Sequence, residues 1–221
     1  MAPVNTRTAA DAAALRGPPS AVAAAGPADL ALRSLPPDPV AAAEALLGMT
    51  LVVVRDGIVR SGTIVETEAY GGPEDRASHA RAGRTARTAP MFGPPGHAYV
   101  YLVYGIHHCL NVVAHADGTA GAVLLRALRM DGPDDARIAA GPGRLTRHLG
   151  IDRRDDGRLL AAPSAVRLVD PGPAARAAAR APGIVRGPRI GIDAAGPGWA
   201  DRPWRFGIRR DAALSRPFPE T

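Results

Sequence analysis

Two glutamates and a tyrosine alternate along one short stretch of the chain, as Glu66, Glu68 and Tyr70. Alternate side chains of a β-strand share a face, so we expect these three to lie together. The opposite face would carry Val65, Thr67 and Ala69 against the core. A carboxylate beside an aromatic ring is typical of a general base in a pocket wall. The alternative is a solvated strand face on which both glutamates pair with surface arginines, and spacing alone does not choose between Glu66 and Glu68.

Tyrosine and histidine gather in the middle third of the chain. All four tyrosines fall between Tyr70 and Tyr104, and five of the six histidines fall between His79 and His115. A core does not need this clustering of amphipathic rings, so it indicates one site.

A metal site is a further alternative for the histidines. The adjacent residues His107 and His108 would point to opposite faces of a strand, and no HExxH or CxxC motif is present. We therefore expect no metal and no cofactor. Activity lost to a chelator, with bound zinc, would favour a histidine-rich metallohydrolase instead.

One large ring is predicted beside the tip of a β-hairpin. Two strand-like runs flank a turn at Gly105, which leaves Tyr104 poorly placed for burial. Proteins that distort duplex DNA insert such side chains between base steps. Arg84 and Arg87 lie in the preceding loop, and arginine binds phosphates through a fixed fork of donors. These residues indicate a DNA-binding face; a loop kept soluble by its charges is the alternative.

All 27 basic residues are arginine, because the chain contains no lysine. Mechanisms that use a lysine side chain are excluded, including Schiff bases, pyridoxal anchoring and the Walker phosphate loop.

The net charge of +6 indicates a polyanionic partner such as nucleic acid. The single cysteine, Cys109, excludes a disulfide scaffold and a multi-cysteine metal site. No apolar run reaches the roughly 18–20 residues that span a bilayer, and no signal peptide is recognisable, so we expect a cytoplasmic location.

The surrounding elements predict a single compact α+β domain. Short helices are expected at 40–47 and 142–149, and an Asp56-Gly57 hairpin turn joins strands 50–55 and 58–70. The other expected strands are 98–104, 108–114, 121–128, 166–169, 184–185, 190–192 and 204–208. Strands without long helical crossovers favour a mostly antiparallel curved sheet, here with flanking helices and a protruding β-hairpin. The expected divisions are an Ala/Pro-rich, disordered tail at 1–37, the domain at 38–215 and a short C-terminal tail at 216–221.

Several longer motifs follow one another at compatible spacing. They are Glu66-Thr67-Glu68-Ala69-Tyr70, Gly72-Pro73-Glu74-Asp75, Ala77-Ser78-His79, Met91-Phe92, residues 99–105, Cys109-Leu110-Asn111, residues 123–128, residues 141–145, residues 189–192 and Trp204-Arg205-Phe206. Together they span roughly residues 40 to 210 and resemble the alkyladenine (3-methyladenine) DNA glycosylase family in its bacterial form.

The resemblance implies an enzyme that flips damaged purines out of duplex DNA and hydrolyses the N-glycosidic bond in base excision repair. Its substrates would be 3-methyladenine, 7-methylguanine and hypoxanthine, and in some members ethenoadenine. It also implies a monofunctional, metal-free protein without lyase activity, acting as a monomer and associated with the nucleoid when bound to DNA. A non-catalytic protein that binds lesions through the same pocket is the alternative.

The resemblance also implies a role for each matched residue. Glu68 matches the general base that activates water, and Arg126 matches a residue near that water. The remaining matches are Tyr70, His79 and Tyr101 for the rings that sandwich the purine, Asn111 for the residue that rejects the 2-amino group of guanine, and Tyr104 for the ring that fills the vacated stack. Arg84 and Arg87 are expected to contact DNA phosphates.

Overall fold

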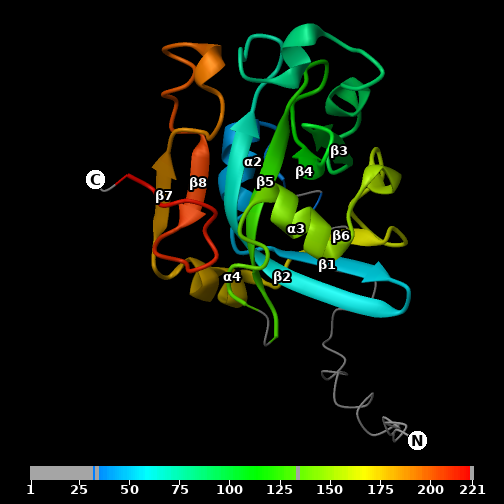
Figure 1. Cartoon of the computed structure of the whole chain (residues 1–221), viewed down its shortest axis with the longest axis vertical. Coiled ribbons are helices and arrows are strands. Elements are labelled where there is room, and N and C mark those ends of the chain that lie inside the picture. Colours follow the sequence, from blue (N-terminus) through cyan, green and yellow to red (C-terminus); the bar gives the residue numbers. More distant parts are fainter. Residues whose placement is uncertain (1–31, 33–34, 133–134, 220–221) are drawn as a thin grey trace, which may run out of the picture.

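The longest strand, β2 (Ile58–Tyr70), runs through the centre of one curled antiparallel sheet. Figure 1 shows this arrangement in a computed structural model, which describes residue 32 and residues 35–132 and 135–219. The first half of β2 pairs with β1 (Thr50–Arg55), and its second half pairs with β5 (Ala122–Met130). β2 therefore carries the Glu66–Tyr70 motif in the middle of the sheet.

The other strands extend the sheet to both sides. The strand order is β3-β4-β5-β2-β1-β6, and β8 also pairs with β2 and with β7. Their bounds are β3 (Ala98–Val103), β4 (His107–Val113), β6 (Val166–Val169), β7 (Ile184–Gly187) and β8 (Arg205–Ile208). Because β8 meets β2 at Glu66–Glu68, that motif has strands on both sides.

Two short helices close the core of the sheet. α2 (Pro39–Leu46) starts where the Asp38 side chain accepts a hydrogen bond from the Val40 N–H at 2.9 Å, and it packs on β2 and β5. α3 (Pro142–Leu149) packs on β4 and β5, and Leu145 and Leu149 join the main core. The sheet and helices therefore form the predicted α+β domain. A third helix, α4 (Pro173–Arg180), was not predicted, because its Ala/Arg/Pro composition resembles that of the N-terminal tail and none of its residues is buried.

Two hairpin turns use backbone with positive φ. Asp56 and Gly57 have φ of 53° and 72°, which confirms the predicted turn between β1 and β2. Tyr104 and Gly105 have φ of 50° and 73° at the tip between β3 and β4. A tyrosine in the left-handed region costs about 1–2 kcal/mol. Such strain at an exposed tip is a reason to look for function there.

The predicted face of β2 is wrong at one position. The pairing of β2 with β5 shifts register between Ile64 and Glu66 and again between Glu66 and Thr67. This irregularity sends Ile64 and Ala69 into the main core, whereas Val65 packs into a separate small cluster with Ala127, Ile208 and Ala213. A bulge changes the face that a residue beside it occupies, and simple alternation cannot reveal it.

A second prediction is wrong in the C-terminal third. Residues 190–192 form a loop and not a strand. The apolar Ile-Gly-Ile sequence of this loop is typical of a buried strand, but Gly191 has a φ of 76° and interrupts the extended backbone. The loop lies at the candidate site, as described below.

The chain ends bear on the expected tails. Residues 1–31 and 33–34 lie outside the described residues, and Leu32 and Leu35 pack against the main core. At the other end, the Arg205 guanidinium lies 3.8 Å from the Phe218 ring centroid. The divisions at 37 and 215 stay predictions. Among the described residues, no helix is long and apolar enough to cross a membrane.

Candidate active site

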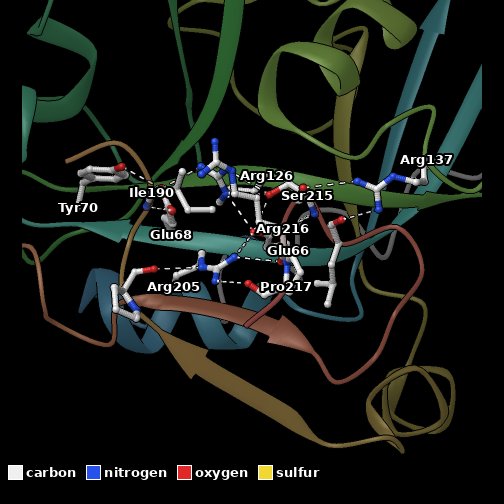
Figure 2. A network of polar contacts seen from close by, with 12 residues as sticks. Glu66, Glu68, Tyr70, Arg126, Arg137, Ile190, Arg205, Ser215, Arg216 and Pro217 are labelled. Atoms are coloured by element: carbon white, nitrogen blue, oxygen red, sulfur yellow. Dashed lines mark hydrogen bonds and ion pairs between the residues drawn. The ribbon is translucent and has the colours of Figure 1, made fainter. Parts of the chain in front are cut away.

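Both glutamates of the motif are buried. Glu66 and Glu68 have no exposed surface, so the solvated strand face considered above is wrong. Figure 2 shows the network of polar contacts around them. Arg126 of β5 joins the two carboxylates, with Nε 3.1 Å from Glu66 Oε1 and Nη1 3.3 Å from Glu68 Oε2. The predicted proximity of the two carboxylates is therefore present, but in the protein interior.

Glu66 is surrounded by hydrogen-bond donors. Its Oε1 accepts from Arg126, from Arg205 Nη1 at 3.1 Å and from the Ser215 hydroxyl at 2.8 Å. Its Oε2 accepts from the Ser215 N–H at 2.5 Å. A carboxylate with this many fixed donors is suited to hold other groups in place.

Glu68 has fewer partners and a perturbed acidity. Its Oε1 accepts from the Ile190 N–H at 2.7 Å, and its Oε2 accepts from the Tyr70 hydroxyl at 2.9 Å. Burial raises the pKa of Glu68, although Arg126, the Ile190 N–H and the Tyr70 hydroxyl act in the opposite direction. A buried carboxylate with a raised pKa is a stronger base, as a group that takes a proton from water must be.

Arg126 keeps its charge between the two carboxylates. Burial alone would lower the pKa of Arg126, but Glu68 and Glu66 outweigh it and raise the pKa. The guanidinium is therefore a fixed positive charge beside Glu68.

A cavity of about 550 Å³ opens in front of Glu68. The three residues that contact the Glu68 carboxylate, Tyr70, Arg126 and Ile190, all line it, whereas Glu68 lies just behind that wall. All four tyrosines line the cavity, as their clustering predicted, but His79 is the one histidine among the lining residues. The histidine cluster thus overstated the site: His97, for example, bonds to the Pro94 carbonyl at 3.0 Å.

Tyr99, Tyr101 and His79 form an aromatic side of the cavity. The rings of Tyr99 and Tyr101 lie 5.2 Å apart, and His79 meets Tyr101 edge-on at 4.6 Å. His79 Nδ1 lies 3.0 Å from the Tyr99 hydroxyl. Burial, with a smaller effect from Arg87, lowers the pKa of His79, and burial raises the pKa of Tyr99 to about 12. These rings are neutral at neutral pH and offer flat surfaces and hydrogen bonds.

Asn111 lies on β4 opposite Tyr99 and is almost fully buried. Its Nδ2 donates to the Tyr99 carbonyl at 3.0 Å, which fixes the direction of the amide. The fixed amide lines the same cavity as the rings.

Two of the three residues expected to contact DNA line the cavity, and the third does not. Tyr104 lines its rim with 92% of its surface exposed. Arg87 also lines it, with its guanidinium 5.7 Å from the Tyr101 ring centroid. Arg84 is exposed but is not among the lining residues. The structure therefore brings Arg87, and not Arg84, to the aromatic rings.

Sequence reasoning missed several residues that hold the site together. Asp75 and Arg189 form an ion pair with no exposed surface, at 2.6 Å. Arg189 also lies 4.8 Å from the Tyr70 ring centroid and 5.0 Å from that of Trp204. Asp75 and Arg189 both fall in motifs that carry the family resemblance, and this could have pointed to them. Ser215 lies in none of those motifs.

No three side chains of His, Cys, Asp or Glu come together as a possible metal site within the described ranges. Glu66 and Glu68 are bound instead by arginine and by N–H and O–H donors. These residues do not make a metal centre.

A buried carboxylate behind an aromatic cavity, with an exposed ring at its rim, is an arrangement suited to a hydrolase that acts on a flat base. A family model described as methylpurine-DNA glycosylase matches residues 34–212. The chain therefore belongs to the methylpurine-DNA glycosylase family, and it is a DNA glycosylase of base excision repair. This membership favours the enzyme over the lesion-binding alternative.

Relatives from several bacteria agree with this assignment. A protein of Anaeromyxobacter dehalogenans strain 2CP-C is 50% identical over 179 residues, which cover 80% of this chain and 82% of that protein. A protein of Myxococcus xanthus is 46% identical over 178 residues (80% and 88% covered), and one of Bacillus mycoides is 42% identical over 198 residues (81% and 95%). All three are named "Putative 3-methyladenine DNA glycosylase".

Proposed function

We propose that this glycosylase releases 3-methyladenine, 7-methylguanine, hypoxanthine and ethenoadenine from duplex DNA, with Glu68 as the general base. The observation that carries the proposal is the buried Glu68 carboxylate, bonded to Tyr70 and Ile190 directly behind the aromatic cavity. The names of the relatives support 3-methyladenine as a substrate. The size of the cavity, about 550 Å³, supports a site that accepts several purines.

Glu68 and Arg126 would act together on water. Water that enters beside Arg126 gives a proton to Glu68, and its oxygen bonds to C1′ of the flipped nucleotide while the N-glycosidic bond breaks and the purine leaves with that bond's electron pair. A cationic alkylated purine leaves as a neutral base, whereas hypoxanthine leaves as an anion that takes a proton from water. The carboxylate also stabilises the positive charge that develops on the sugar, as in other glycoside hydrolyses. The chain contains no lysine side chain for a Schiff base, which supports hydrolysis without a lyase step.

The cavity would select bases by stacking and by shape. Tyr70, Tyr101 and His79 offer ring faces, and cationic alkylated purines bind aromatic faces well. Asn111, held by the Tyr99 carbonyl, would reject the 2-amino group of normal guanine. Because the pKa of His79 is lowered, that ring is neutral and supplies no charged acid for a neutral leaving base. We therefore expect cationic bases to leave faster than hypoxanthine.

The outer rim would hold the distorted duplex. Tyr104 fills the space that the flipped base leaves, and Arg84 and Arg87 bind the phosphates. We also propose that the protein works as a monomer on nucleoid DNA; light scattering with and without a short duplex tests this stoichiometry.

Base release from duplex DNA tests the proposal. One substrate carries hypoxanthine opposite thymine and the other is methylated DNA, each treated with the wild type, Glu68→Gln and the control Glu44→Gln on exposed α2 surface. We expect the wild type and the control to release bases from both substrates and Glu68→Gln to bind but release neither. Release by Glu68→Gln would exclude Glu68 as the base, and release of methylated bases alone would remove the neutral purines from the substrate range.

A further inference from the structure

The last part of the chain contacts the interior of the active site. The match to the family ends at residue 212, yet residues 213–217 (the C-terminal segment) lie against the Glu66 and Arg126 network. Figure 2 shows Ser215 between Arg126 and Arg137, with Arg216 and Pro217 beside Arg205. The family motifs therefore do not account for this part of the site.

Ser215 bridges Glu66 and Arg126. Its hydroxyl oxygen accepts from Arg126 Nη2 at 3.2 Å and from Nε at 3.4 Å, and its hydroxyl hydrogen goes to Glu66 Oε1 at 2.8 Å. Its N–H donates to Glu66 Oε2. Within the described part of the chain, Glu66, Glu68 and Ser215 are the side chains recorded in polar contact with the Arg126 guanidinium.

The C-terminal segment is fixed on both sides of Ser215. Arg137 Nη1 donates to the carbonyls of Ala212 and Leu214 at 3.3 and 3.2 Å. Arg205 donates to the carbonyls of Arg216 and Pro217 at 3.3 and 3.0 Å. The buried side chain of Ala213 packs in the cluster that contains Val65. Ser215 is therefore presented to Arg126 by a braced backbone and not by a loose end.

We propose that Ser215 is a positioning residue, which holds the Arg126 guanidinium so that Nη1 points to Glu68. The planar guanidinium has two edges with donors: Ser215 and Glu66 take the Nε side, which leaves Nη1 for Glu68. The proposal rests on the roles given above to Glu68 and Arg126. It gives the C-terminal segment, which lies beyond the family match, a part in positioning Arg126.

Loss of the Ser215 hydroxyl would change the acidity of Glu68. The ionisable groups that face Glu68 are Arg126 of β5, Glu66 and Tyr70 of β2, Tyr101 of β3 and Cys109 of β4. Arg126 is the main charge that lowers the pKa of Glu68 against the effect of burial. If Arg126 turns away, that pKa rises, and a smaller fraction of Glu68 is ionised at a given acidic pH.

Single-turnover base release from methylated duplex DNA tests the proposal across pH. The variants are Ser215→Ala and Ser215→Thr, which keeps the hydroxyl. The control is Ser164→Ala, at a half-buried serine in the loop before β6. We expect Ser215→Ala to be about tenfold slower, the loss of one hydrogen bond to a charged group. The acidic limb of its pH–rate profile should move to higher pH, and its affinity for DNA should stay within about twofold of the wild type. Ser215→Thr should restore both the rate and the position of the acidic limb.

Either of two outcomes for a folded Ser215→Ala would overturn the proposal. One is a folded Ser215→Ala with the rate and acidic limb of Ser164→Ala. The other is a slower Ser215→Ala whose acidic limb does not move, which indicates only a structural role. Should Ser215→Ala fail to fold, Ser215→Cys, with a similar shape and a weaker donor, must show the shifted limb, and an unshifted limb overturns the proposal. Glu68→Gln is measured alongside: its activity tests the general base separately, whatever Ser215 does.

Discussion

The hydroxyl of Tyr70 donates a hydrogen bond to Glu68 Oε2 at 2.9 Å, between two side chains on the same face of β2. The aromatic wall of the cavity and the buried carboxylate are thereby one unit. Arg189 lies 4.8 Å from the same tyrosine ring and holds it from behind. A base that stacks on Tyr70 is consequently placed next to the group proposed to activate water.

Tyr70→Phe separates the ring from its hydrogen bond. The ring face stays, so affinity for damaged DNA should change little. The hydroxyl lowers the pKa of Glu68, so its removal should raise that pKa and move the acidic limb of the pH–rate profile to higher pH. We expect a rate lower by about tenfold under acidic conditions, measured by single-turnover base release. An unchanged limb would show that the Tyr70 hydroxyl does not act on the base.

Glu68→Gln should be more stable than the wild type at neutral pH. The folded-state pKa of Glu68 is raised, so folding favours the protonated carboxyl. Arg126 keeps its ion pair with Glu66, so a neutral side chain at position 68 leaves no buried charge without a partner. A carboxyl whose pKa is raised by folding does not lower the free energy of unfolding below its unfolded pKa of about 4.3, and lowers it fully above its folded pKa. The melting temperature of the variant should exceed that of the wild type at pH 8, and the gap should close as the pH falls toward 4. A variant less stable at both pH values would contradict this prediction.

The local pattern of the sequence predicts most of the sheet but not its irregularities. Asp38-Pro39 and Asp56-Gly57 each specify their structure locally, and both are confirmed. The run that ends at Tyr70 forms the predicted strand, but Val65 does not lie on the predicted face. The displacement of Val65 depends on how β2 meets β5, about 60 residues later, so no local pattern contains it.

The candidate site shows the same division. The clustered tyrosines predicted the cavity, and alternation predicted the shared face of Glu66, Glu68 and Tyr70. The partners that immobilise these residues, Arg205 and Ser215, come from positions 139 and 149 residues away from Glu66. Burial and partner choice are tertiary properties, so the local pattern is equally consistent with a solvated face.

Tyr104→Gly should reduce base release without reducing stability. The side chain is 92% exposed, and its φ of 50° is strained for tyrosine and easy for glycine. Relief of about 1–2 kcal/mol offsets the entropy that glycine adds to the unfolded chain. We expect an unchanged or higher melting temperature and slower release from duplex DNA. A clear fall in melting temperature would mean that the ring contributes to packing.

Arg84→Ala and Arg87→Ala should differ. Each phosphate contact that is lost reduces the salt dependence of DNA binding by about 0.9 in the log–log slope. Both variants should show this change, because both arginines are exposed in the loop before β3. Arg87 also lies beside the Tyr101 ring and lowers the pKa of His79, so Arg87→Ala alone should also alter base release at saturating protein. Binding curves between low and moderate salt, together with single-turnover rates, distinguish the two.

Asp75→Ala should be among the most destabilising single changes near the site. The Asp75 and Arg189 side chains have no exposed surface, and Asp75 also accepts from the Gly71 and Ala77 N–H groups at 3.0 Å. Removal of one partner leaves a buried charge without compensation, which costs about 3–5 kcal/mol.

The exposed pair of Glu44 and Arg186 gives the matched control, because Glu44→Ala removes an ion pair that water screens. That control should cost at most about 1 kcal/mol in urea unfolding. Replacing both members of the buried pair, as Asp75→Leu with Arg189→Met, should recover part of the loss, since no lone charge remains. Base release should stay low in this double variant, because the cation that supports Tyr70 is gone. Equal losses of unfolding free energy for Asp75→Ala and Glu44→Ala would contradict the prediction that the buried ion pair stabilises this wall of the cavity.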